Sequence, residues 1–320
     1  MLSPMEYPNL KEPYKVLLKK GEFIDQSRLG PSAAPRVVPF KIYHPVDHDL
    51  DKMPVIIWSH GFGGNANGAA FISRFLAGQG YILVHITHLG TDSSLWEGKP
   101  GHPWDILQKV KISREDTLAR FNDVPFVLDQ LKIWAQENPD VGQYMDFDAL
   151  GMSGHSFGAM TTQVMAGQKF PDVDGSLISI KEDRFKAGIL YSPVPIRHLV
   201  DESVSDEEIF GSINIPLLHM SGTEDDSPLE GFGYQYRLAV YEHTGIDEKY
   251  LLVKEGGDHM VYNGTRGKLG DSDLREVHED LILKAALAFW DMQLKGDDAA
   301  AAWIKDGGLA AYVGERGTFS

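Results

Sequence analysis

Residues 150–158 read Leu-Gly-Met-Ser-Gly-His-Ser-Phe-Gly, a short apolar stretch that runs into a Gly-x-Ser-x-Gly motif. Small residues follow the motif and favour a helix, so Ser156 is expected on a tight turn between a strand and a helix. Glycines suit both flanking positions because a side chain there would collide with the neighbouring strand and helix. The helix N-terminus also favours developing negative charge. This context predicts a nucleophilic serine; a purely structural glycine turn is the alternative interpretation.

Apolar runs on both sides of the motif predict the rest of the fold. The runs at 53–59 and 81–86 are continuous and flanked by turn residues, which is typical of strands buried on both faces of a parallel sheet. Further strands are expected at 185–191, 216–220 and 250–254. These strands alternate with helical segments, so the chain is predicted to be an α/β protein with a mostly parallel central sheet flanked by helices.

Helices are expected at 66–76 and 112–134, and Pro125 either kinks the second helix or marks a new start within it. Residues 87–111 and 193–213 resist this pattern and are interpreted as cap or loop insertions. Residues 1–35 are interpreted as an N-terminal extension with at most one or two short strands. We expect a single domain over residues 1–320.

A second glycine cluster follows the apolar run at 53–59, where residues 60–64 read His-Gly-Phe-Gly-Gly. Acyl transfer passes through a tetrahedral oxyanion, which two backbone N–H groups can stabilise. The expected donors are the backbone N–H groups of Phe62 and Phe157. A plain turn and a nucleotide-phosphate loop are the alternatives, and the second is excluded because neither glycine-rich phosphate motif is present.

A nucleophilic serine needs a general base, and the base needs an acid that orients it. Among twelve histidines, His259 stands apart because it follows the strand at 250–254 on a Gly-Gly-Asp turn. The acid is expected after the preceding strand, where Asp225 fits Gly-x-x-Asp spacing and Asp226 is the alternative. The order serine, aspartate, histidine is the one that the nucleophile elbow of α/β-hydrolases requires.

The candidate substrate contacts are mostly apolar. Trp96, Trp104 and the 193–213 insert either form an acyl or alcohol pocket or simply cover the top of the sheet. His88 is expected at the rim of the pocket, and Met260 is a further candidate contact. No metal or cofactor is expected, because four histidines that a zinc site would need lack carboxylate partners at H-E-x-x-H spacing: His85, His88, His102 and His155. His155 is instead interpreted as a packed neighbour in the elbow.

Charge narrows the possible partners. The chain carries a net charge of −16, and such a surface repels phosphate backbones and anionic membranes, so we expect no nucleic-acid partner and no stable membrane association. The chain has no cysteine, which excludes disulfides and a thiolate nucleophile. No signal peptide or membrane span is visible, which favours a cytoplasmic protein, although a removed export signal would give the same sequence.

Three motifs together resemble one family. They are residues 58–64, Arg120-x-x-Asp123 followed by Leu128-Asp129, and residues 154–159. They resemble the platelet-activating-factor acetylhydrolase-like group of α/β-hydrolases, many bacterial members of which are called predicted dienelactone hydrolases. True dienelactone hydrolases use a cysteine nucleophile, which this chain lacks. The resemblance runs from about residue 37 to the C-terminal helix.

The resemblance implies a serine esterase in which Ser156, Asp225 and His259 form the triad and Phe62 and Phe157 donate to the oxyanion. We expect hydrolysis of carboxylic esters of small to medium apolar acyl groups through an acyl-enzyme. The expected partner is a small-molecule ester. Cutinase-like polyester cleavage, phospholipid acetyl-ester hydrolysis and acyl transfer stay open, as does a non-catalytic ligand-binding protein on a hydrolase scaffold. The natural ester and the oligomeric state are not determined by the sequence.

Overall fold

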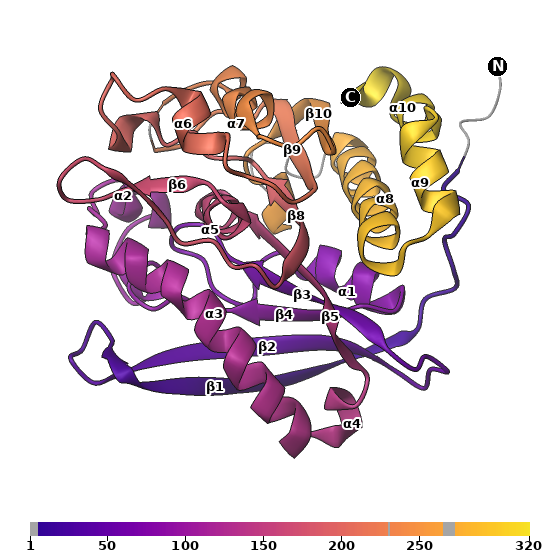
Figure 1. The fold of residues 1–320 in the computed structure, drawn as a ribbon, viewed down its shortest axis with the longest axis horizontal. Helices are drawn as coiled ribbons and strands as arrows, with labels where there is room; N and C mark the ends of the chain where they lie inside the picture. Colours follow the sequence, from indigo (N-terminus) through magenta and orange to yellow (C-terminus); the bar gives the residue numbers. More distant parts are fainter. Residues whose placement is uncertain (1–5, 230, 265–272) are drawn as a thin grey trace.

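The computed structural model describes residues 6–229, 231–264 and 273–320, and within them a nine-stranded sheet forms the centre of the molecule (Figure 1). The strand order is β1-β2-β4-β3-β5-β8-β9-β10-β11. The six inner strands from β4 to β10 pair in parallel, and β1, β2 and β11 add antiparallel edges. The strands of this sheet are β1 (Lys15–Leu29), β2 (Pro35–Val46), β3 (Met53–Ser59), β4 (Ile82–Ile86), β5 (Met145–His155), β8 (Phe185–Tyr191), β9 (Leu217–Glu224), β10 (Lys249–Asp258) and β11 (Gly317–Phe319).

Helices cover both faces of the sheet (Figure 1). They are α1 (Ala70–Gly78), α2 (Pro103–Leu107), α3 (Arg114–Glu137), α4 (Pro139–Gly142), α5 (Phe157–Ala166), α6 (Asp206–Phe210), α7 (Leu238–His243), α8 (Asp273–Lys295), α9 (Asp298–Lys305) and α10 (Gly308–Val313). Short 3₁₀ turns occur in the connections, namely η1 (Ser93–Leu95), η2 (Arg197–Leu199), η3 (Tyr234–Arg237), η4 (Val261–Asn263) and η5 (Gly314–Arg316). The mixed α/β class with a largely parallel central sheet is confirmed.

Strand β3 shows why the apolar run at 53–59 forms a central strand. Successive strand side chains point to opposite faces, so Val55 and Ile57 pack in the core that contains residues of α3 and α5. Ile56 and Trp58 point the other way, into the core that contains residues of α1 and α8. All four side chains are buried. The sheet is therefore the middle of three layers.

The helices differ from the sequence-based expectation in two places. Helix α3 runs without interruption through Pro125, so this proline does not start a new helix. Helix α1 begins at Ala70, later than expected, because Ala69 has a left-handed backbone (φ 54°) that a helix interior does not accept.

The N-terminal and inserted segments contain more structure than the sequence indicated. The strand in the N-terminal extension is not short as expected, because β1 is a 15-residue edge strand that pairs with β2 along most of its length. A second, two-stranded sheet joins β6 (Lys169–Pro171) to β7 (Leu177–Ser179), which was not expected. The insertion at 87–111 contains η1 and α2, and the insertion at 193–213 contains η2 and α6.

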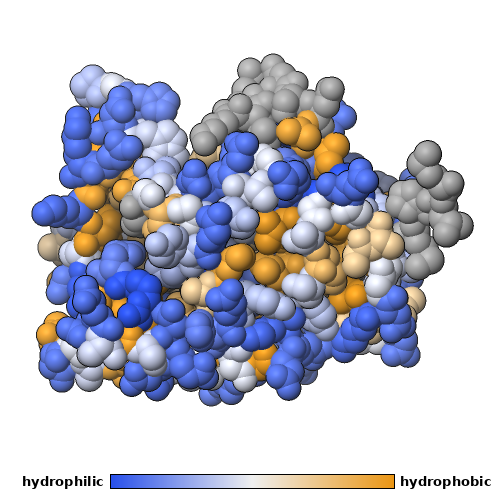
Figure 2. All heavy atoms as spheres, turned by 90° about the horizontal axis from the view of Figure 1, so that it is seen from above, coloured by the Kyte–Doolittle hydropathy of each residue, from blue (hydrophilic) through white to orange (hydrophobic). Residues whose placement is uncertain are grey.

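The N-terminal segment lies against the last helices (Figure 1). The Tyr7 hydroxyl donates to Asp291 of α8 over 2.7 Å, and its ring centroid is 5.0 Å from that of Trp303 of α9. Seen from above, most of the visible surface is hydrophilic, with hydrophobic residues gathered mainly near the middle of this face (Figure 2). None of the helices in the described ranges combines the length and apolar character that crossing a bilayer requires.

Candidate active site

Ser156 lies on a strained turn between β5 and α5. Its backbone has φ 55° and ψ −116°, a conformation rarely adopted by a residue with a side chain, and its N–H donates to the Tyr191 carbonyl over 2.9 Å. The flanking glycines are required by close packing. A Cβ atom on Gly158 would lie 1.9 Å from the Ser59 carbonyl oxygen, and one on Gly154 would lie 2.4 Å from the Gly158 backbone. Backbone strain of this kind gathers at functional sites.

The structure brings Ser156 together with the two residues that sequence order selected. The Nε2 atom of His259 is 3.0 Å from the Ser156 Oγ atom, and the Nδ1 atom is 2.7 Å from Asp225 Oδ1. Because the carboxylate accepts the Nδ1 proton, Nε2 is left to accept the serine proton. Asp226 is exposed to solvent, whereas Asp225 is fully buried. The geometry therefore selects Asp225 over its neighbour.

Asp225 is held by partners besides His259. The Ser221 hydroxyl donates to its Oδ2 atom over 2.9 Å, and the Arg237 Nε atom lies 3.1 Å from Oδ1. Burial raises the pKa of the Asp225 carboxyl, but the Arg237 charge and the His259 hydrogen bond oppose burial and lower the pKa to about 2. Asp225 is consequently ionised at neutral pH, as an acid that orients a histidine must be.

Arg237 of η3 joins three parts of the site. Its Nε and Nη1 groups donate to the carbonyl oxygens of Asp225 and Pro193, over 2.8 and 2.9 Å. Its Nη2 atom lies 3.2 Å from His259 Nδ1. Sequence reasoning missed this residue, because a single arginine after two tyrosines carries no motif.

His155 contributes to the placement of the base. Its Nε2–H donates to the His259 carbonyl over 2.7 Å, and the two ring centroids are 4.7 Å apart. Burial lowers the pKa of the His155 ring well below its usual value, so the ring is neutral. The sequence placed His155 in the elbow as a packed neighbour; the structure adds this hydrogen bond to the loop that carries His259.

The candidate oxyanion donors lie beside the nucleophile. A Cβ atom on Gly61 would lie 3.6 Å from Ser156 Cβ, so the glycine loop passes directly next to the serine. Phe157 is the first residue of α5, and the N–H of a first helical residue has no acceptor within its helix. Phe62 and Phe157 both line the pocket described below. Their N–H groups are suitable to bind an oxyanion formed on a carbonyl attacked by Ser156.

A pocket of about 420 Å³ opens beside Ser156 and His259. Trp104 and Met260, two candidate contacts from the sequence, line it, and Val194 and Leu199 bring in the 193–213 insert. Met160 and Phe232 add further apolar surface. Among the described residues that line this pocket there is no aspartate or glutamate, which makes it unlike the acidic chain as a whole.

Two candidate substrate contacts lie elsewhere. His88 is fully buried outside the pocket, with Nδ1 2.9 Å from Asp123 Oδ2 and Nε2 3.0 Å from the Ser59 hydroxyl. Its expected place at the rim is wrong, because these polar groups hold the ring beneath the glycine loop. Trp96 is also outside the pocket, and its Nε1–H donates to the Gly63 carbonyl over 2.7 Å. The indole supports the glycine loop from outside.

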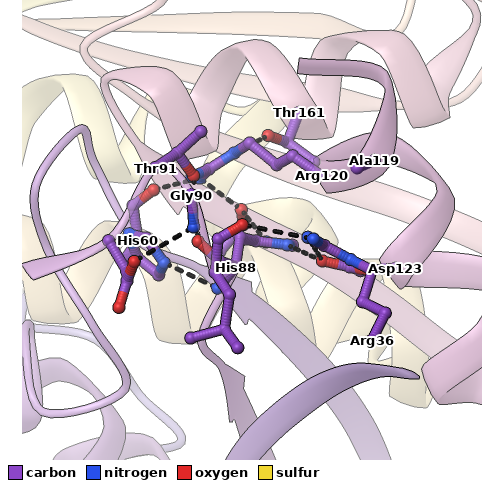
Figure 3. A network of polar contacts seen from close by, with 12 residues as sticks. Arg36, His60, His88, Gly90, Thr91, Ala119, Arg120, Asp123 and Thr161 are labelled. Atoms are coloured by element: carbon purple, nitrogen blue, oxygen red, sulfur yellow. Dashed lines mark hydrogen bonds and ion pairs between the residues drawn. The ribbon is translucent and has the colours of Figure 1, made fainter. Parts of the chain in front are cut away.

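Ser59, His88 and Asp123 form a second serine–histidine–aspartate array, part of the network in Figure 3. Arg36 binds both Asp123 carboxylate oxygens over 2.6 Å. The three side chains of the array are completely buried and none of them lines the pocket beside Ser156, so a substrate in that pocket does not reach Ser59. Access to a pocket distinguishes the array at Ser156 from this one.

Across the described ranges no group of three or more His, Cys, Asp or Glu side chains is arranged to hold a metal ion. No protein-family model matches the chain, and no curated protein matches it.

Proposed function

We propose that this chain has the α/β-hydrolase fold and is a serine-dependent carboxylic-ester hydrolase, similar to the platelet-activating-factor acetylhydrolase-like group that its motifs resemble. The observation that carries the proposal is the continuous hydrogen-bonded chain from Ser156 through His259 to Asp225. At its serine end this series of hydrogen bonds reaches the pocket, where Ser156 is half-buried beside the N–H groups of Phe62 and Phe157.

In the proposed acylation step, the Ser156 Oγ atom attacks the ester carbonyl carbon while His259 Nε2 takes the hydroxyl proton. The carbonyl π electrons move onto oxygen, and the N–H groups of Phe62 and Phe157 bind the resulting oxyanion. Asp225 stabilises the imidazolium that forms. When the carbonyl re-forms, the bond to the alcohol oxygen breaks, and His259 returns its proton to the leaving alcohol.

Deacylation repeats these events with water. His259 Nε2 takes a proton from a water molecule, the water oxygen attacks the acyl carbon, and the same two N–H groups bind the oxyanion. Collapse of this intermediate breaks the bond to Ser156, whose oxygen recovers the proton from His259. The products are the free acid and the resting enzyme, so the cycle requires no cofactor.

The pocket supports small to medium apolar acyl groups as substrates. Its volume of about 420 Å³ lies in the range of small-molecule sites. Trp104, Met160 and Phe232 offer apolar contacts. Arg237, the one arginine among the described residues that line the pocket, already binds Asp225. A neutral acyl chain is therefore favoured over a charged one.

The test is hydrolysis of p-nitrophenyl esters from acetate to palmitate by the wild-type chain and by Ser156→Ala and His259→Ala. Loss of either group removes nucleophilic attack, so we expect kcat to fall by about 10⁵-fold or more in both variants. Ser176→Ala, at an exposed turn, is the control and should retain wild-type turnover. The preferred chain length then measures the depth of the pocket.

A fluorophosphonate probe followed by mass spectrometry locates the reactive serine independently of the ester chosen. We expect the label on Ser156 and none on Ser59 of the buried array. If the wild-type chain hydrolyses no ester and its Ser156 is not labelled, the non-catalytic binding protein replaces this proposal.

A further inference from the structure

Arg120 of α3 is a fully buried arginine whose side chain is occupied by hydrogen bonds. Its Nε atom donates to Thr161 Oγ1 over 2.8 Å, and Nη1 donates to Thr91 Oγ1 over 3.0 Å. Its Nη2 atom donates to the Ser59 hydroxyl over 2.8 Å and to the His60 carbonyl. Figure 3 shows Arg120 between Thr91 and Thr161, with His60 on the other side of Thr91.

One set of these contacts leads to Phe157. The Thr161 hydroxyl that accepts from Arg120 donates in turn to the Phe157 carbonyl over 2.9 Å, one helical turn earlier in α5. The guanidinium carbon of Arg120 also lies 4.4 Å from the centroid of the Phe157 ring. Arg120 therefore holds both the backbone and the side chain of this candidate donor.

The other set leads to Phe62 from both sides. Ser59 and His60 are bound directly by Arg120 and precede Phe62 in the chain. Thr91, also bound by Arg120, accepts the Gly63 N–H on its own carbonyl over 2.9 Å. The peptide that carries the Phe62 N–H thus lies between two segments, residues 59–60 and Gly63. Arg120 binds the first directly and the second through Thr91.

The charge of Arg120 is not neutralised by an ion pair with a carboxylate among the described residues. Asp123, an acidic residue of the same network, is bound by Arg36 and His88. Burial lowers the pKa of the Arg120 guanidinium to about 9, so the group is still charged at neutral pH. A buried cation without its own anion is costly to fold. The positive charge of the Arg120 guanidinium would stabilise a negative charge that forms at the neighbouring oxyanion site.

We propose that Arg120 is a positioning residue of the oxyanion hole, which holds the Phe62 and Phe157 N–H groups at the spacing that the oxyanion requires. The inference rests on the proposed ester hydrolysis and assigns a residue that does not touch the substrate. Because the oxyanion exists only along the reaction path, Arg120 contributes to kcat and has little influence on KM.

Thr161→Val tests this inference with little change in shape, since it removes the hydroxyl that links Arg120 to Phe157. We expect kcat to fall about tenfold while KM changes less than about twofold. Thr161→Ser keeps the hydroxyl, so most of kcat should be retained in that variant. Arg120→Lys keeps the charge but loses the planar set of donors, and we expect a loss of kcat of about 100-fold.

Two further measurements separate positioning from a merely structural role. Active sites are counted by fluorophosphonate labelling, so that kcat is expressed per folded site. Inhibition by an alkyl trifluoromethyl ketone, which forms a tetrahedral oxyanion adduct with a serine, should weaken in each variant by the same factor as kcat/KM falls.

The inference is overturned if wild type hydrolyses esters and Thr161→Val keeps its kcat per labelled site and its affinity for the ketone. If Thr161→Val or Arg120→Lys lowers the melting temperature but leaves kcat per labelled site unchanged, Arg120 has a structural role only. If Arg120→Lys does not fold, the comparison of Thr161→Val with Thr161→Ser still decides. Absence of turnover and labelling in wild type is a different result, which overturns the proposed function itself.

Discussion

At Asp225 two physical effects act in opposite directions. Burial disfavours the carboxylate, whereas Arg237 and His259 favour it, and the balance lowers the carboxyl pKa from 3.8 to about 2. A pKa lowered by folding means that ionised Asp225 stabilises the fold above about pH 4, and that this stabilisation is lost as the pH falls through about 2. A pKa shift of this size corresponds to a contribution on the order of 2 kcal/mol to the free energy of unfolding at neutral pH.

We expect Arg237→Gln to move the acid limb of the kcat/KM profile to higher pH. Without the arginine charge, burial dominates and the Asp225 pKa rises, so the carboxyl becomes protonated at a pH where the wild-type carboxyl is ionised. A protonated Asp225 no longer holds the His259 ring for proton transfer. The measurement is kcat/KM for a neutral ester between about pH 4 and pH 9.

Arg237→Lys is the matched control. It keeps a positive charge near Asp225, but a lysine has a single nitrogen in place of the three guanidinium nitrogens of Arg237. Its acid limb should stay close to that of wild type, although its kcat is lower if the hydrogen bond to Pro193 matters for alignment. An unchanged acid limb in Arg237→Gln would show that the arginine does not control ionisation of Asp225.

The sequence predicted individual site residues where the signal is local, and failed where it is not. Ser156 and His259 were selected by the turns they sit on, and the structure places them 3.0 Å apart although they are 103 residues apart in the chain. His88 carried no local signal of its partners, since Ser59 and Asp123 are 29 and 35 residues away. A histidine after a buried strand looks the same in sequence whether it faces a pocket or a sealed network.

At the scale of elements, the elbow between β5 and α5 depends on the absence of side chains. Gly158, in the first turn of α5, lies against the Ser59 carbonyl at the end of β3, close enough that a Cβ atom would meet the oxygen at 1.9 Å. Neither partner can move freely, because both are backbone in a strand and a helix. The close approach also brings β3, and with it the glycine loop, next to Ser156.

We therefore expect Gly158→Ala to destabilise the protein by about 3 kcal/mol and to reduce ester turnover, because α5 must move away from β3. Denaturant unfolding measures the first effect, and kcat per labelled site measures the second. Gly30→Ala is the control, since a Cβ there finds its nearest neighbour at an ordinary 3.5 Å. Equal stability of the two variants would contradict this account of the elbow.

The elements that sequence reasoning recovered are those with a strong periodic or apolar pattern. The runs at β3 and β4 are buried on both faces and could be predicted from hydrophobicity alone. Strand β1 was missed because most of its side chains are exposed or half-buried and several are charged, which is how an edge strand avoids pairing with other molecules. The three-residue strands β6 and β7 are too short to show any period.

At the scale of the whole molecule, the parallel order of the sheet brings the site together. The loops after β5, β9 and β10 carry Ser156, Asp225 and His259, and in parallel strands the carboxyl ends lie at one edge of the sheet. The connection after β3 adds the glycine loop at the same edge. Residues far apart in the chain thus meet without any long-range sequence signal beyond the order of the strands.

The net charge of −16 acts on substrates before they reach this edge. We expect a p-nitrophenyl ester of succinic acid, which carries one negative charge, to show a lower kcat/KM than the neutral butyrate ester of similar size. Repulsion by the acidic surface reaches about 30 Å at 0.01 M salt and about 3 Å at 1 M, so added salt should narrow the difference. The butyrate ester, being neutral, provides the control for other effects of salt on the enzyme. A succinate ester that is preferred at low salt and loses its advantage as salt is added would show instead that Arg237 recognises an anionic acyl group, since it is the arginine among the described residues that line the pocket.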